Sequence, residues 1–223
     1  FFVVLIASVV YNFLPDFSRG TDVGTNIGNE IAQSWNTQNP RATYLLMDVP
    51  TLQPEMDTPI EGVADSEEMT VKARITRMDI LVEKKAPAET SVFSLAFGVL
   101  GGSPAVYLLT ILGAFSYAAI IVLMFLIIHS LRRSIREERT LDKRNVWYLR
   151  AIGMLTIVTE LISDTVDWVM NSRAAELLAG SGYTVDAGFH VSYAMIIMGI
   201  LILFAAEVFA IGQNLSEEQK LTI

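Results

Sequence analysis

Three carboxylates lie on one face of an apolar stretch that is long enough to cross a membrane. Glu160, Asp164 and Asp167 fall within the run Val146–Asn171, at spacings of four and three residues. Those spacings place the three side chains on one side of a helix. A charge at the centre of a bilayer costs about 2.5 to 3.5 kcal/mol. We therefore expect this acidic stripe to face protein or water and not lipid.

Two interpretations of the acidic stripe remain open at the level of sequence. In the functional one, it lines a hydrated cavity, an ion or proton site, or a docking face for another subunit. In the structural one, Glu160 is protonated or hydrogen-bonded to a neighbour such as Ser116 or Tyr117, which lie at a similar depth in the preceding apolar segment.

Matching depths in the membrane predict two further contacts. Arg150 lies near the start of its segment and Glu207 near the end of its own, which places both at the cytoplasmic side. An interhelical ion pair is therefore open to them. At the other ends, His190 is close in depth to Asp167, and we expect structural pairing there as well. His129 is nearly a bilayer away from His190, which argues against a haem held by both histidines.

Four apolar segments predict the elements that position these residues. The first gives only about 21 Å of helix and is expected to begin before Phe1. The second starts with Ser103 as N-cap and Pro104 at the first helical position. The predicted membrane helices are Phe1–Leu14, Ser103–His129, Val146–Asn171 and Phe189–Ile211.

Basic residues crowd between the second and third segments and set the predicted orientation. The positive-inside rule places the loop 130–145 in the cytoplasm, against the anionic inner leaflet. Alternation then puts residues 15–102 outside, and both termini, including the tail after the last helix, inside. The outer region holds 13 acidic against 7 basic residues. The cluster consists of Arg132, Arg133, Arg136, Arg139, Lys143 and Arg144, with Arg150 just beyond it.

The outer region, residues 15–102, is long enough for a small folded domain with some β structure. Apolar and polar residues alternate over Met69–Thr76 and, more loosely, on to Val82, which predicts a half-buried strand. The apolar stretch Ala42–Val49 is a candidate partner strand. We expect a short helix along the membrane surface at Val23–Trp35 and an interfacial approach to the second membrane helix at Val92–Leu100.

Composition and missing motifs narrow the function class. The chain of 223 residues is 52% hydrophobic and only 18% charged, and it contains no cysteine. These values indicate an all-α integral membrane protein with three units: the first helix (1–14), the outer region (15–102) and a three-helix part (103–223). Phosphate-binding loops, nucleophile elbows and zinc motifs are missing from the sequence. We expect neither an enzyme nor a cofactor or metal site, and direct binding of nucleic acid is disfavoured because acids dilute the basic cluster.

Two stretches of the chain carry a family likeness. One is Ala206–Gly212 followed by Leu215–Ile223, and the other is Arg144–Val146 with Leu149–Arg150 and Ile152–Gly153. They resemble motifs of a bacterial membrane family catalogued as domain of unknown function 2975, over roughly residues 104–223. The resemblance implies four helices in the bacterial inner membrane and an extracytoplasmic segment after the first. It also implies a helix-turn-helix regulator as a partner.

The sequence favours a protein that works by association. It would be an accessory subunit of a larger membrane complex, part of a homo-oligomer, or a membrane anchor and sensor for a cytoplasmic regulator. The alternative is a small transporter or proton-handling component that uses the acidic stripe.

Overall fold

The computed structural model describes residues 41–52, 58–59, 72–85, 92–136 and 143–221, together with scattered positions from 7 to 33. The described part is mostly helical, with a small sheet. The predicted first membrane helix, residues 1–14, lies outside the described residues except for Ala7 and Tyr11. Every described position from Thr21 to Gln33 is helical, in the region where the sequence predicts a short helix.

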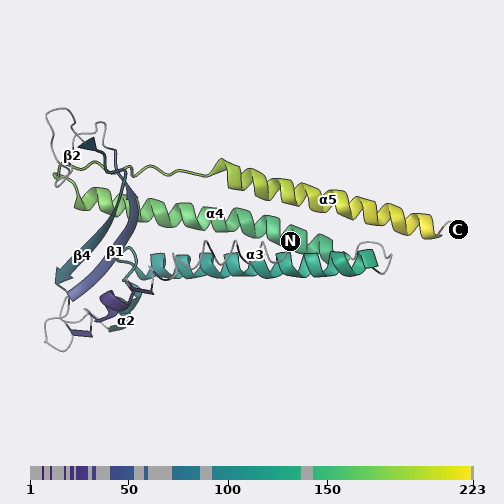
Figure 1. Ribbon diagram of the computed structural model, residues 1–223, viewed down its shortest axis with the longest axis horizontal. Coiled ribbons are helices and arrows are strands. Elements are labelled where there is room, and N and C mark those ends of the chain that lie inside the picture. Colours follow the sequence, from purple (N-terminus) through teal and green to yellow (C-terminus); the bar gives the residue numbers. More distant parts are fainter. Residues whose placement is uncertain are drawn as a thin grey trace. The chain divides into compact units, whose positions relative to one another are not determined.

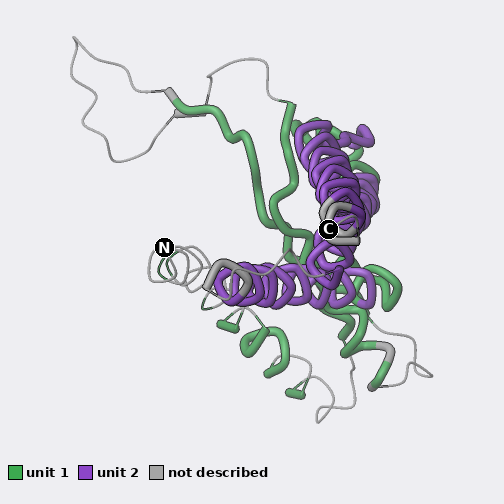
Figure 2. Tube along the Cα trace, turned by 90° about the vertical axis from the view of Figure 1, so that its right-hand side faces the viewer, with its two compact units in different colours: residues 1–107, 173–186 green, residues 108–172, 187–223 purple. Residues whose placement is uncertain are grey.

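The chain divides into two compact units, which Figure 2 shows in different colours. Unit 1 comprises residues 1–107 and 173–186, and unit 2 comprises residues 108–172 and 187–223. Unit 1 thus joins the predicted outer region to the stretch that follows the third apolar segment.

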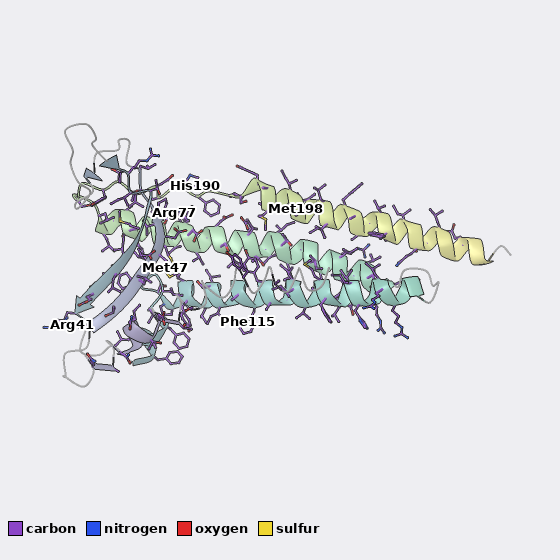
Figure 3. The ribbon with its side chains drawn as sticks, in the orientation of Figure 1. Arg41, Met47, Arg77, Phe115, His190 and Met198 are labelled. Atoms are coloured by element: carbon purple, nitrogen blue, oxygen red, sulfur yellow. The ribbon has the colours of Figure 1, made fainter. Side chains whose placement is uncertain are left out.

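Unit 1 is built on two long antiparallel strands, β1 (Arg41–Pro50) and β4 (Arg77–Lys85) (Figure 1). Arg41 and Arg77, the first residues of the two strands, lie at opposite ends of this ribbon (Figure 3). The predicted strand at Ala42–Val49 is confirmed by β1.

The partner strand of β1 forms in the later part of the predicted alternation, which was expected to continue to Val82. Of the described residues within Met69–Thr76, Lys72–Ala73 forms a strand, β3, which pairs with the equally short β2 (Thr58–Pro59). The alternating residues that pair with β1 are those of β4, and their apolar members lie opposite the buried part of β1. These half-buried side chains are Met78, Ile80 and Val82.

A bulge in β1 brings two apolar residues three positions apart into the same core. One extra residue of β1 is accommodated between Leu46 and Val49, and both of these side chains are fully buried. Asp48 takes a left-handed conformation with φ of 56°, which aspartate tolerates better than most residues. Its N–H donates to the Asp79 carboxylate at 2.9 Å, and its own carboxylate pairs with Arg77.

The other edge of β1 is also covered. The N–H of Leu45 donates to the Val99 carbonyl at 2.9 Å, and the N–H of Gly101 donates to the Leu45 carbonyl at 3.0 Å. Further along, Thr51 bridges to Val185. Residues 92–100, predicted as an interfacial approach, therefore form a short helix, α2 (Val92–Phe97), and a turn that ends in a single bridge from Leu100 to Leu45 of β1.

Unit 2 is made from three helices that are long and apolar enough to cross a membrane. They are α3 (Pro104–Arg136), α4 (Lys143–Leu177) and α5 (Tyr193–Leu221), and α4 lies between the other two (Figure 1). The first residues of α3 and the last residues of α4 belong to unit 1. By length and composition, these helices mark the chain as a membrane protein.

Two helix starts show which boundary signals are local. The start of α3 at Pro104 follows the prediction, because a serine N-cap and a proline at the first turn act through neighbouring residues alone. The last apolar segment instead becomes helical only at Tyr193, four residues after the predicted start at Phe189. The ring of Phe189 packs edge-on against the ring of Trp168 on α4, with 6.3 Å between the two ring centroids. Phe189 thus makes a tertiary contact from a position outside the helix.

Helices α4 and α5 cross at a pair of glycines. A Cβ atom at Gly153 would lie 2.9 Å from the Gly199 carbonyl and 2.8 Å from Leu203, and one at Gly199 would lie 2.6 Å from Ile157. Each of these distances is too short for a real carbon contact. The crossing therefore depends on both glycines, as in membrane helix pairs that pack through small residues.

Candidate functional site

The three acids of the stripe occupy three different environments on α4. Asp164 is buried, with 9% of its surface exposed, while Glu160 is half-buried and Asp167 is exposed. Neighbouring hydroxyls bond within their own helix, since Thr156 and Thr165 donate to the carbonyls of Ile152 and Leu161. The stripe is thus graded from a buried centre to an exposed end.

Asp164 connects α4 to the start of α5. The main chain of Ser192, which directly precedes α5, hydrogen-bonds to this carboxylate. The Ser192 carbonyl in turn accepts the N–H groups of Met195 and Ile196 at 3.1 and 3.3 Å, so Ser192 occupies the N-cap position. An acid at the N-terminus of a helix is favourable because the free N–H groups there carry partial positive charge. The second oxygen, Asp164 Oδ2, is buried without a partner among the described residues.

The proposed partners of Glu160 are placed differently from one another. The Ser116 hydroxyl is buried and donates to the Leu112 carbonyl of its own helix at 2.9 Å. The Tyr117 side chain is about half exposed. A bond from either of them to Glu160 stays a prediction.

Arg150 and Glu207 are brought together by α4 and α5. Arg150 Nε lies 2.8 Å from Glu207 Oε1, and Arg150 Nη2 lies 2.9 Å from Glu207 Oε2. This is the two-pronged geometry in which a guanidinium matches a carboxylate best. Both side chains are about half exposed. The pair and the glycine crossing thus join the same two helices.

His190 lies in the connection that leads into α5 (Figure 3). Its Nδ1 is 3.0 Å from the Gly188 carbonyl. The neighbouring contact of Phe189 with Trp168 brings this connection to the turn of α4 that carries Asp167. The pairing of His190 with Asp167 itself stays a prediction.

The basic cluster is divided between two helices. Arg132 and Arg133 are exposed near the end of α3, Arg136 is its last residue, and Lys143 and Arg144 are exposed at the start of α4. Arg139 lies outside the described residues. Most of the predicted loop 130–145 is thus helical, and only residues 137–142 separate α3 from α4.

A groove in unit 1 was not predicted, because its lining comes from segments far apart in the sequence. It has a volume of about 440 Å³ and is lined by residues of β1 and β4, the α2 region and the end of α4. The Arg173 guanidinium enters it and donates to the Gly101 carbonyl. We call it the unit 1 groove, and its lining residues are Ala42, Thr43, Tyr44, Lys84, Leu95, Gly98, Gly102, Arg173, Glu176 and Leu177.

Comparison with known proteins decides the family. The family model described as "Protein of unknown function (DUF2975)" matches residues 34–223. The chain belongs to this family. No curated protein and no solved structure matches the chain.

The DUF2975 match extends beyond the motifs that first indicated it. Those motifs lie at residues 144–153 and 206–223, whereas the match begins at residue 34. It therefore includes β1, β4, the unit 1 groove and the glycine crossing, together with the three membrane-length helices that the structure describes.

Proposed function

We propose that the protein is a non-enzymatic membrane protein that works by association. The observation that carries this proposal is that charged groups of α4 bind the segment of α5. Arg150 forms an ion pair with Glu207, and the Asp164 carboxylate accepts a hydrogen bond from the main chain of Ser192. Charges used in this way hold helices together. They are not free to move an ion through the membrane.

The outward faces of the other two helices support the same proposal. Large apolar side chains on α3 and α5 are exposed, Phe115 and Phe204 among them at 70% and 67%. In Figure 3, Phe115 projects from α3. Such faces suit lipid, a second copy of the chain or the helices of another membrane subunit. As an accessory subunit or as an anchor and sensor for a cytoplasmic regulator, the protein would use these faces and the basic ends of α3 and α4.

The orientation is part of the proposal. The basic ends of α3 and α4 would face the cytoplasm of a bacterial cell, with both termini, and unit 1 would lie outside. Cysteines introduced at Ser134 and at Thr58 should then react with a membrane-impermeant thiol reagent from opposite sides of the membrane. Reaction of both from the same side of intact cells would overturn this orientation.

Glu160 separates association from ion transport. If the acidic stripe packs or docks, Glu160→Gln should leave the protein nearly unchanged, because an amide and a protonated acid make similar hydrogen bonds, while Glu160→Leu should weaken assembly or stability. If the stripe conducts protons or ions, proteoliposomes should show a flux that Glu160→Gln abolishes. Detection of that flux would favour the transporter.

Association itself is tested by gentle purification of the full chain followed by native mass spectrometry. We expect the chain to travel with a second copy or with another membrane subunit. A chain that is consistently solitary, under detergents that preserve known membrane complexes, would contradict the proposal.

A further inference from the structure

The unit 1 groove carries two cations and one acid. Lys84 and Arg173 contribute positive charge to its lining, and Glu176 contributes the negative charge. Neither Lys84 nor Glu176 forms an ion pair with another residue in the described part of the chain. The groove therefore has a net positive charge, and its charges are available to a ligand.

Arg173 is held in place before any ligand arrives. Its Nη1 donates to the Gly101 carbonyl, and a Cβ atom at Gly102 would lie 3.1 Å from Nη1 and 3.3 Å from the Tyr44 ring. Gly102 has a φ of 65°, a conformation that side chains rarely adopt. A guanidinium has five N–H donors, so this fixed group keeps several for an anion.

The edge of β1 adds a main-chain donor. The N–H and carbonyl of Leu45 bond to Val99 and Gly101, which lie on the side of β1 away from β4. Bonding directions repeat every second residue in an antiparallel strand, so the main-chain groups of Thr43 point the same way. Thr43 lines the groove, so this edge of β1 can add the Thr43 N–H to the donors there.

The position of the groove along the chain indicates the level at which it meets the membrane. Gly102 lies just before α3 begins, and Arg173–Leu177 forms the end of α4. Helix α4 has 35 residues. At 1.5 Å per residue it is about 52 Å long, which exceeds a hydrocarbon core of about 30 Å. The groove thus lies where two membrane-length helices leave the hydrocarbon, at the depth of lipid headgroups.

The apolar part of the lining fits the rest of a lipid. Two leucines line the groove: Leu95 is buried, and Leu177 is 47% exposed. A phosphate would meet Arg173 and Lys84, a headgroup amine would meet Glu176, and the glycerol backbone with the first methylenes would lie against Leu177.

We propose that the unit 1 groove binds the phosphodiester headgroup of a membrane phospholipid. The proposal does not depend on the proposed function, since no residue of the groove takes part in the contacts between α4 and α5. A free phosphodiester offers the same anion, so the test must separate the two sources.

The decisive comparison uses two neighbouring lysines. The full chain is titrated with dihexanoyl phosphatidylethanolamine in detergent, and bound lipid is counted by native mass spectrometry. Lys84→Gln should weaken binding about three- to five-fold, the size expected for loss of one exposed charge contact. Lys85→Gln is the matched control, because Lys85 is exposed on the same strand but does not line the groove, and it should bind as the unchanged chain does.

Arg173→Gln should have the larger effect, a loss of at least about ten-fold, since it removes the fixed fork of donors. Because Arg173 also bonds Gly101, a thermal melt must show that this variant remains folded, and Lys84→Gln decides the question if it does not. Equal binding by the unchanged chain, Lys84→Gln and Lys85→Gln would overturn the proposal. Soluble glycerophosphoethanolamine should bind more weakly than the lipid, and binding that is as tight would overturn the assignment to a lipid.

Discussion

Helix α4 and its two neighbours reverse the pattern of water-soluble bundles, in which the most apolar surfaces are the most buried. The mean hydropathy of the most apolar window is 1.3 in α4, against 2.7 in α3 and 2.6 in α5. Yet 28% of that window is buried within the chain in α4, against 11% in each of the others. The least apolar of the three described membrane-length helices is thus the most enclosed. In a membrane the apolar helices can face lipid, so the enclosed place goes to the helix whose polar groups need partners.

The largest effect should come from the point where α4 is enclosed most closely. Gly153→Leu would place a side chain against the Gly199 carbonyl and Leu203, and it should push α5 away from α4. Overpacking of this kind costs about 1 to 3 kcal/mol, so we expect a clear fall in the melting temperature in detergent.

The matched control for this change is Gly212→Leu. A Cβ atom at Gly212, on the same α5 that Gly153 contacts, has nothing within 4 Å. Gly212→Leu should therefore leave the melting temperature nearly unchanged. Equal destabilisation by both changes would mean that the glycine crossing does not enclose α4.

A smaller effect is expected at Asp164. Asp164→Leu removes the acceptor for the main chain of Ser192, and the loss of a helix N-cap contact costs about 1 kcal/mol. Asp164→Asn keeps an oxygen in the same place and should cost less. Thermal melts of the two variants test this order, and an asparagine variant that is less stable than the leucine variant would show that the contact with Ser192 is not the role of Asp164.

The smallest effect should come from the half-exposed ion pair. Arg150→Ala and Glu207→Ala should each lower the melting temperature slightly, and the double variant should lose less than the sum of the two. Such a cycle measures the interaction itself. Strict additivity would indicate that the two side chains do not stabilise each other in the membrane environment.

The sequence predicts those parts of the fold that are decided locally. The start of α3 follows from Ser103 and Pro104, and the three long apolar runs follow from hydropathy alone. The similar depths of Arg150 and Glu207 in the membrane were enough to predict their ion pair, because the rise per residue of a helix converts residue number into height. Similar depth alone does not bring two side chains into contact, so the pairing of Asp167 with His190, which precedes α5, stays a prediction.

Tertiary contacts decide the rest. The predicted alternation runs from Met69 to Val82, and its later part, in β4, pairs with β1. There Asp48, at the bulge, bonds to Arg77 and Asp79. Nothing local marks Arg173 as a groove residue, since its partner Gly101 is 72 positions away. Asp164 likewise finds Ser192 only because α5 begins later than its apolar run does.

The order of synthesis gives the contacts of α4 a consequence for biogenesis. Helix α4 leaves the ribosome before α5, yet Ser192 and Glu207, which satisfy Asp164 and Arg150, both belong to the later segment. Without α5, helix α4 would insert with unpaired charges. The free-energy cost of burying those charges in lipid is scarcely offset by the gain from its apolar residues, because its mean hydropathy is modest. We therefore expect α4 to remain at the insertion machinery until α5 emerges, so that the two enter the bilayer as a hairpin. A chain cut short before α5 would leave α4 only loosely integrated and exposed to membrane quality-control proteases.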